Sequence, residues 1–307
     1  MPPSGRNPLD VERIALAHVP GPGALVSERL GRGLVNETYR VARAGQRYSV
    51  RIPAPHAEDL GLDRAWECRV LCAAAAAGLA PPIEHCEPAR GILVARWVDG
   101  AALTPAQVVD PAHIRAVALL ARKVHALPIP RAPRCMDPAR WVAHYSAALE
   151  RRGRSPRRAD LDAAMEARLA ALAALPAAAV LCHSDLHVAN LVAGTAGLTL
   201  LDWEYAHVAD PFWDLAGWSC NNDFAPQSRR LLLASYLGRE PAGPELARLD
   251  HLAWLYDYVC LLWSELYAVL AGTEGREVLA RAQALAERLK WSSAVVGAGN
   301  FRHTTGL

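Results

Sequence analysis

The sequence lacks the features that would carry the chain into or across a membrane. No window of about 18 or more residues is apolar without a charge or a proline, so no membrane span is expected. Residues 1–6 contain no apolar segment typical of a secretory signal, and we expect a cytoplasmic protein. The seven cysteines include no Cys-x-x-Cys pair, which predicts reduced thiols rather than a disulfide framework.

The sequence also lacks a strong charge imbalance and an internal repeat. Its formal net charge is +2, which gives no reason to expect a nucleic acid or an anionic membrane surface as a partner. With 52% hydrophobic and 21% charged residues, the composition is that of a folded protein. A length of 307 residues is enough for one large domain or two lobes, and the composition leaves the oligomeric state open.

The pattern of apolar residues changes near residue 100. Before this point, short alternating runs predict strands, one turn and one helix: strands 24–30, 36–41, 47–52, 83–86 and 91–97, a turn at 31–34 and a helix at 63–77. After it, helical periodicity dominates: helices 105–127 with a break at Pro111, 138–151, 161–175 and 211–293 with a break at 238–244, besides short strands at 180–182, 190–192 and 198–201. The sequence therefore predicts an α+β protein with a small antiparallel β-rich lobe, residues 1–98, and a larger, mainly helical lobe, residues 99–307.

The most informative motif is His183-Ser184-Asp185-Leu186-His187-Val188-Ala189-Asn190, followed by Asp202-Trp203-Glu204. Phosphoryl transfer needs a group that orients a hydroxyl and accepts its proton, and oxygen ligands for magnesium on the phosphates. Asp185 is the candidate for the first task, and Asn190 and Asp202 are the candidates for the second. The predicted hairpin between Asn190 and Asp202 should bring these two ligands together.

The same motif has two other interpretations. His183, Asp185 and His187 together could form a metal cluster of the metallohydrolase type, but this would need further ligands at matching spacing, and the sequence has no second such motif. Alternatively, His183 and His187 only satisfy backbone groups. For these two histidines the second interpretation is favoured.

The quoted residues, with Leu201-Asp202-Trp203-Glu204-Tyr205-Ala206, resemble the protein-kinase-like superfamily. They are most similar to its small-molecule kinases: aminoglycoside phosphotransferases, choline and ethanolamine kinases, and bacterial thiamine kinases. The resemblance implies a two-lobe protein-kinase-like fold that binds ATP and Mg²⁺ between the lobes. It also implies that Asp185, Asn190 and Asp202 form the catalytic set, with Asn190 and Asp202 holding the metal.

The resemblance extends to the predicted N-terminal lobe. The segment Gly31-x-Gly33-Leu34-x-Asn36-x-Thr38 resembles a phosphate-binding loop in which Asn36 replaces the third glycine. The strand Tyr48-Ser49-Val50-Arg51-Ile52 resembles the strand that carries the phosphate-pairing lysine, here Arg51. The resemblance further implies that Glu67 pairs with Arg51 and that the hinge, Arg96-Trp97-Val98, contacts adenine through its backbone.

Two departures from protein kinases indicate a small-molecule acceptor. Ser184 stands where protein kinases have an arginine that grips a phosphorylated activation loop. No Ala-Pro-Glu motif follows Asp202, and eleven residues separate Asp202 from Asp214, which leaves no room for a platform that binds protein substrates.

Residues 251–270 are rich in aromatic side chains, and the spacing of Tyr256, Trp263 and Tyr267 places them on one helix face. Such a face could cage a quaternary ammonium or thiazolium group through cation–π contacts, although aromatic residues at this spacing are also typical of a core. The remaining candidates for acceptor binding are Asp185, Trp203, Glu204, Trp218 and Asp223. We expect a small cationic alcohol of the choline, ethanolamine or thiamine type. The alternatives are an aminoglycoside or macrolide phosphotransferase and a nucleotide-binding pseudokinase.

Overall fold

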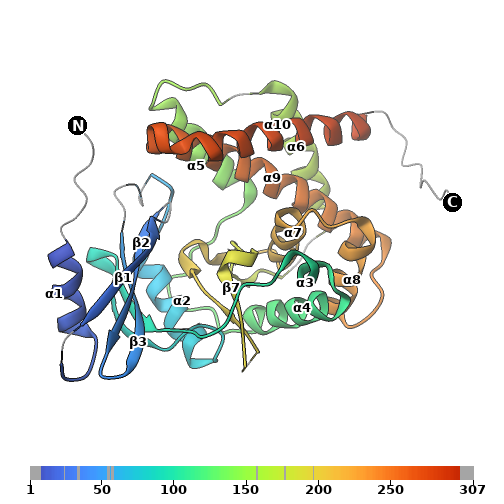
Figure 1. The fold of residues 1–307 in the computed structure, drawn as a ribbon. Coiled ribbons are helices and arrows are strands. Elements are labelled where there is room, and N and C mark those ends of the chain that lie inside the picture. The colour runs from blue at the N-terminus through green and yellow to red at the C-terminus, as the bar shows by residue number, and fades with distance from the viewer. Residues whose placement is uncertain are drawn as a thin grey trace. The chain divides into compact units, whose positions relative to one another are not determined.

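The computed structural model describes residues 8–23, 25–32, 35–53, 56, 59–156, 158–175, 178–195 and 197–297 (Figure 1). The chain divides by its contacts into two compact units. The first unit contains residues 1–134 and 181–208, and the second contains residues 135–180 and 209–307. A boundary between lobes at residue 98 stays a prediction.

A five-stranded antiparallel sheet dominates the first unit. Its spatial order is β1-β2-β3-β5-β4, and its strands are β1 (Val26–Arg32), β2 (Asn36–Arg43), β3 (Gln46–Pro53), β4 (Ile83–Glu87) and β5 (Ile92–Arg96). Helix α1 (Pro8–His18) lies along this sheet (Figure 1). Its apolar side chains Val11, Ile14 and Ala15 are buried in one cluster with Val50 and Val94 of the sheet. Helix and strands thereby share one apolar core.

Two features of this region differ from the sequence-based expectation. Residues 31 and 32 were expected in a turn, but Gly31 and Arg32 lie in β1 opposite Thr38 and Glu37. The ladder continues because a bulge between Arg29 and Gly31 absorbs the change of register. Gly33 and Leu34 lie outside the described residues. Helix α1 was not predicted, because it precedes the strand pattern on which the prediction rested.

The rest of the first unit consists of helices and two short strand pairs. It contains α2 (Arg64–Ala76), the 3₁₀ turn η1 (Pro88–Arg90), α3 (Pro105–Val109), α4 (Pro111–His125), β6 (Val180–Cys182), η2 (Val188–Asn190), β7 (Leu191–Gly194), β8 (Gly197–Leu200), η3 (Trp203–Tyr205) and β9 (His207–Ala209). Strand β6 pairs with β9, and β7 pairs with β8. Asp63 caps α2 by accepting a hydrogen bond from the Trp66 backbone N–H at 2.9 Å. The helix expected at 63–77 and the break at Pro111 are confirmed.

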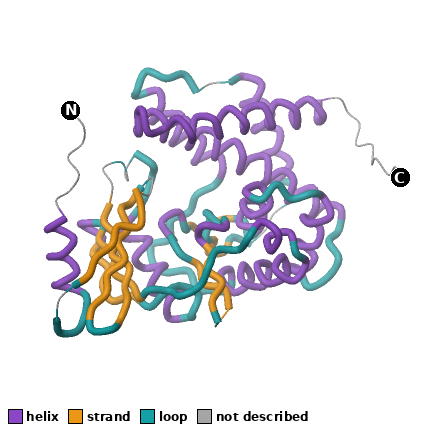
Figure 2. Tube along the Cα trace, in the orientation of Figure 1, coloured by secondary structure: helices purple, strands orange, loops and turns teal. Residues whose placement is uncertain are grey.

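The second unit is mainly helical (Figure 2). It contains α5 (Pro138–Glu150), α6 (Ala159–Ala173), α7 (Phe212–Asn221), α8 (Pro226–Leu237), α9 (Gly243–Ala271), η4 (Gly272–Gly275) and α10 (Arg276–Gly297). Helix α9 packs against α5, α6, α7 and α10. The interruption expected at 238–244 is present, and two further interruptions at 222–225 and 272–275 were not predicted. The predicted fold class, a small antiparallel sheet and a larger helical part, is confirmed.

Among the described residues, no helix combines the length and apolarity required to cross a bilayer.

Close packing against a neighbouring backbone requires a glycine at position 100, which follows β5 in the sequence. Its φ is +157°, and a Cβ there would lie 2.4 Å from the Ala193 carbonyl oxygen. The neighbouring Ala101 exchanges two hydrogen bonds with Ala193, at 3.1 and 2.9 Å. The segment after the sheet is thereby joined to β7, which follows directly after Asn190.

Replacing Gly100 should therefore destabilise the fold. We expect Gly100→Ala to lower the free energy of unfolding by more than about 2 kcal/mol. The backbone conformation at this position is strained for alanine, and β7 must move to make room for the added Cβ. Gly243→Ala is the matched control, since no atom lies within 4 Å of its added Cβ and its φ is not positive. That control should change stability by less than about 0.5 kcal/mol. Denaturant unfolding measures both, and equal effects in the two variants would contradict the prediction.

Candidate active site

Asp185 lies in a tight loop that follows β6. The preceding residue, Ser184, has a left-handed φ of +70°, which turns the chain sharply after the strand. The Asn190 side-chain amide donates to the Asp185 carbonyl at 3.0 Å and to its carboxylate Oδ2 at 2.9 Å. These bonds close the loop on itself, so the carboxylate is held in place while its side chain keeps 28% exposure.

The β7–β8 hairpin joins Asn190 to the segment that carries Asp202. The Leu201 backbone N–H donates to the Asn190 carbonyl at 2.8 Å. Asp202 follows directly, with a left-handed φ of +57° that ends the extended segment. The expectation that the hairpin brings these two positions together is confirmed. The roles of Asp185, Asn190 and Asp202 in catalysis stay predictions.

The two histidines of the motif contact backbone groups. The His183 ring nitrogen Nε2 lies 2.9 Å from the Leu201 carbonyl oxygen, and its ring packs edge-on against Trp203. His187 accepts from the Ala189 backbone N–H at 3.2 Å, and its Nε2 lies 3.3 Å from the Asp185 carboxylate. Among the described residues, no cluster with metal-binding geometry contains either histidine. The interpretation of His183 and His187 as backbone partners is therefore supported over the metallohydrolase interpretation.

The sheet aligns several of the predicted nucleotide-binding residues. The strand registers place Gly31 opposite Thr38 and Thr38 opposite Arg51, so the three positions form one row across β1, β2 and β3. The Arg51 guanidinium is buried and lies 2.6 Å from Glu67 Oε1 of α2. Its Nη1 also donates to Asp202 Oδ1 at 3.1 Å. The predicted pairing of Arg51 with Glu67 is present, and Arg51 also links β3 to the catalytic segment.

Arg64, at the start of α2, was not among the predicted site residues. Its Nη1 donates to Glu67 at 2.8 Å and to Glu204 at 2.9 Å, and its Nη2 donates to the Asn36 side-chain oxygen at 2.7 Å. The Asn36 amide in turn donates to Glu204 at 2.6 Å. No local pattern in the sequence indicates this network, because Asn36 and Glu204 are 168 residues apart.

Burial and charge set the protonation of these groups. Burial opposes ionisation of Asp185, but the hydrogen bond and charge of His187, the charge of His183 and the Asn190 hydrogen bond lower its pKa overall. Burial raises the pKa of Asp202 against the opposing effect of Arg51. Burial and the Asp202 charge raise the pKa of Glu204 to about 8. Of Asp185, Asp202 and Glu204, Asp185 is therefore the one that stays ionised most readily.

Three neighbouring carboxylates, two of them buried, offer a cation the ligands that it prefers. Glu67, Asp202 and Glu204 each place one oxygen within 4.8 Å of the others. Only two guanidinium groups, those of Arg51 and Arg64, neutralise these three carboxylates directly within the described network. The donor set of hard oxygens fits Mg²⁺. The side-chain nitrogen of Asn190 is hydrogen-bonded to Asp185. The side-chain oxygen of Asn190 would therefore be the atom that binds the metal.

The predicted hinge follows β5. The Arg96 backbone N–H donates to the Pro82 carbonyl at 2.8 Å, and the Trp97 N–H donates to the Arg47 carbonyl at 3.0 Å. These two amides are thus used within the first unit, and Val98 is the next residue along the chain. Contact of Arg96, Trp97 and Val98 with adenine stays a prediction.

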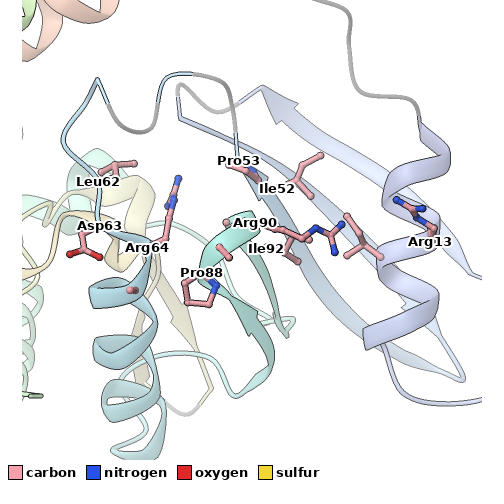
Figure 3. Close-up of a pocket in the computed structure, with 13 residues that line it drawn as sticks. Arg13, Ile52, Pro53, Leu62, Asp63, Arg64, Pro88, Arg90 and Ile92 are labelled. Atoms are coloured by element: carbon pink, nitrogen blue, oxygen red, sulfur yellow. The ribbon is translucent and has the colours of Figure 1, made fainter.

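A separate pocket of about 880 Å³ lies on the sheet-containing unit between α1, the end of β3 and the start of α2 (Figure 3). Arg13, Arg64 and Arg90 line it together with apolar side chains, and Arg90 extends toward α1 (Figure 3). None of the predicted catalytic or nucleotide-binding residues lines this pocket. Only Arg64 connects it to the charged network of the candidate site.

The predicted acceptor residues occupy varied environments. In the first unit, Trp203 is fully buried and donates to the Leu200 carbonyl, while Glu204 is held by Arg64 and Asn36. In the second unit, Trp218 is also buried, and Asp223 pairs with Arg288. The other three are aromatic residues of α9: Tyr256, Trp263 and Tyr267.

These α9 aromatics differ in burial. Tyr256 is buried, and its hydroxyl accepts from Asn221 at 3.0 Å. Trp263 and Tyr267 are half-buried and stack with ring centroids 5.4 Å apart. A role for any of the acceptor candidates in substrate binding stays a prediction.

Comparison with known proteins identifies the family of this chain. The family model described as the phosphotransferase enzyme family matches residues 27–252. The chain therefore belongs to this family, whose model spans the sheet, the catalytic loop and the start of α9. No curated protein matches the sequence.

Solved structures share the fold over most of the chain. A choline/ethanolamine kinase family protein from Mesorhizobium loti is 27% identical with a TM-score of 0.73, over 92% of this chain and 93% of the other. The choline kinase LicA from Streptococcus pneumoniae is 21% identical with a TM-score of 0.74, over 92% and 98% of the two chains, and is also known in complex with AMP. The macrolide 2′-phosphotransferase MphH from Brachybacterium faecium is 21% identical with a TM-score of 0.62, over 90% and 97%. The last two likenesses show the fold alone.

Arg64 should be important for stability because it neutralises two buried carboxylates. We expect Arg64→Ala to lower the free energy of unfolding by about 3–5 kcal/mol, since Glu67 and Glu204 each lose an ion pair. Arg64→Lys should recover part of this loss, because it keeps the charge but not the fork of donors. The control is Arg230→Ala, which removes an exposed pair with Glu240 and should cost less than about 1 kcal/mol. An Arg64→Ala variant as stable as the control would show that the network is not stabilising.

Proposed function

We propose that this phosphotransferase-family chain is an ATP- and magnesium-dependent small-molecule kinase that phosphorylates a hydroxyl group of a small cationic alcohol. The proposal rests on two sets of contacts. Asn190 is hydrogen-bonded to Asp185, and Arg51 of the Arg51–Glu67 ion pair donates a hydrogen bond to Asp202. Each part of a phosphoryl-transfer site has a candidate residue there. The AMP complex of the related LicA fold adds support for a nucleotide ligand.

In the proposed reaction, Asp185 acts on the acceptor. Its ionised carboxylate accepts the proton of the acceptor hydroxyl, whose oxygen forms a bond to the γ-phosphorus of ATP. The bond from the γ-phosphorus to the bridging oxygen breaks, and ADP leaves. The lowered pKa of Asp185 keeps this carboxylate ionised at neutral pH. The two hydrogen bonds from Asn190 orient it before the acceptor binds.

Charge on the phosphates is the second requirement. Bound Mg²⁺, held by Asn190 and Asp202, would neutralise the phosphate oxygens as charge shifts to the leaving group. Arg51 would pair with the phosphates, as the row of Gly31, Thr38 and Arg51 across the sheet suggests. Glu67 holds the Arg51 guanidinium by a 2.6 Å ion pair, which fixes its orientation.

Two observations favour a small cationic alcohol as the acceptor. The relative with 27% identity is a choline/ethanolamine kinase family protein. In addition, the half-buried stack of Trp263 and Tyr267 presents aromatic surface of the kind that binds quaternary ammonium groups. An antibiotic phosphotransferase is the second candidate, because the macrolide phosphotransferase MphH shares the fold.

Removing the charge of Asp185 should abolish transfer without abolishing nucleotide binding. We expect Asp185→Asn to lower kcat by roughly 10²–10⁴-fold, because the amide cannot accept the hydroxyl proton. The affinity for magnesium-ATP should stay within about threefold, since Asp185 acts on the acceptor in this assignment. Coupled ADP-release kinetics and calorimetric ATP binding measure the two effects. Turnover near that of the unmodified protein would refute the assignment of Asp185.

The acceptor can be identified by stimulated ADP release. A panel of choline, ethanolamine, thiamine, homoserine, kanamycin and a macrolide should give stimulation by one small cationic alcohol, with the phosphorylated product confirmed by mass. Asp185→Asn, tested with the same panel, should give no stimulation. Stimulation by kanamycin or the macrolide alone would favour the antibiotic phosphotransferase. ATP binding with no stimulation by any compound would favour the pseudokinase.

A further inference from the structure

Two histidines stack where α1 meets the outer strand β4. The rings of His18, at the end of α1, and His85, in β4, have centroids 3.6 Å apart and planes inclined by 9°. Glu87 is two residues beyond His85 in the same strand, so both side chains project from the same face of the sheet. One donor atom from each of these three residues lies within 4.8 Å of the other two.

The ring nitrogen of His85 lacks a hydrogen-bond partner. Its Nε2 is shielded from solvent and makes no hydrogen bond to any described residue. The Glu87 carboxylate oxygen lies 3.6 Å away, which is beyond a normal hydrogen bond. Because buried polar atoms usually have a partner, this nitrogen indicates a site that binds something further.

Metals bind the neutral form of imidazole, and the surroundings of His18 favour that form. Burial lowers the pKa of His18, and the neighbouring His85 lowers it further, against the opposite effect of Glu87. A ring nitrogen that carries no proton can donate its lone pair to a metal ion at neutral pH.

We propose that His18, His85 and Glu87 form a binding site for a divalent transition-metal ion of the zinc class. Two imidazole nitrogens and one carboxylate oxygen are a typical zinc set, with water as the fourth ligand. Nitrogen ligands discriminate against Mg²⁺ and Ca²⁺, so this site differs in chemistry from the all-oxygen cluster at Asp202. The proposal does not depend on the proposed kinase activity.

Binding would require the three side chains to rearrange. Tetrahedral ligands about 2.1 Å from zinc are roughly 3.4 Å apart, so the donor atoms must close in from their present separations. The histidine rings must also turn out of their parallel stack, because a metal ion lies in the plane of each imidazole ring. The ion would then fasten the last turn of α1 to β4, beside the apolar core that the helix and the sheet share.

Arg90 is a positive charge beside the proposed metal site. Its Nη1 lies 3.3 Å from the same Glu87 oxygen that would bind the metal. Arg90 therefore competes with the ion for Glu87 and repels it. Removing this charge should strengthen metal binding, whereas removing a histidine should weaken it.

The experiment is a titration of tag-free, chelator-treated full-length protein with Zn²⁺, and separately with Co²⁺, in excess Mg²⁺. We expect one high-affinity ion per chain, an increase in Tm on binding, and visible cobalt absorption typical of a tetrahedral site. His18→Gln and His85→Gln should each weaken binding at least about tenfold, and Arg90→Gln should strengthen it. His113→Gln is the matched control, because His113 lies 2.9 Å from the Asp110 carboxylate but has no role in the cluster.

The proposal is overturned by any of three results. The first is that the unmodified protein binds no Zn²⁺ at that stoichiometry, and the second is that binding persists unchanged in both histidine variants. The third is sulfur-to-cobalt charge-transfer absorption, which would place the ion on cysteine thiols instead. Arg90→Gln keeps all three proposed ligands, so its tighter binding can be read even if a histidine variant fails to fold.

Discussion

The candidate site depends on how the first unit pairs three neighbouring carboxylates, two of them buried, with arginine side chains. Glu67, Asp202 and Glu204 lie together, and the guanidinium groups of Arg51 and Arg64 lie among them. Unpaired buried charge is costly, so each arginine must be present for the carboxylates to stay in place. The same groups attach β3, α2 and the catalytic segment to one another. The interaction that stabilises this region thus also sets the charge that a nucleotide and its metal ion would meet.

Backbone geometry complements this electrostatic network. Left-handed residues at Ser184 and Asp202 turn the chain at both ends of the catalytic segment, and the bonds between Leu201 and Asn190 and between Ala101 and Ala193 hold the β7–β8 hairpin. Such positions are strained for residues other than glycine and persist where the surroundings fix them. The backbone of this rigid loop therefore sets the position of Asp185.

Much of the fold could be predicted, and the failures have physical causes. Strand alternation and helix caps are local, so the helix at 63–77, the break at Pro111 and the strand at 180–182 were found. The turn at 31–34 was wrong for Gly31 and Arg32, because a bulge lets the strand continue through a glycine. The interruptions at 222–225 and 272–275 were missed within a stretch whose helical periodicity is nearly continuous.

The sequence by itself determined the chemical groups: the order and spacing of Asp185, Asn190 and Asp202 predicted a phosphoryl-transfer site, and family membership agrees with that chemistry. Only the tertiary structure decided which distant residues serve them. Asn36, Arg64 and Glu204 meet although long stretches of chain separate them, as do His18 and His85. The reason is that local spacing follows the periods of helix and strand, whereas contacts between elements arise only when the sheet and helices pack around a shared core.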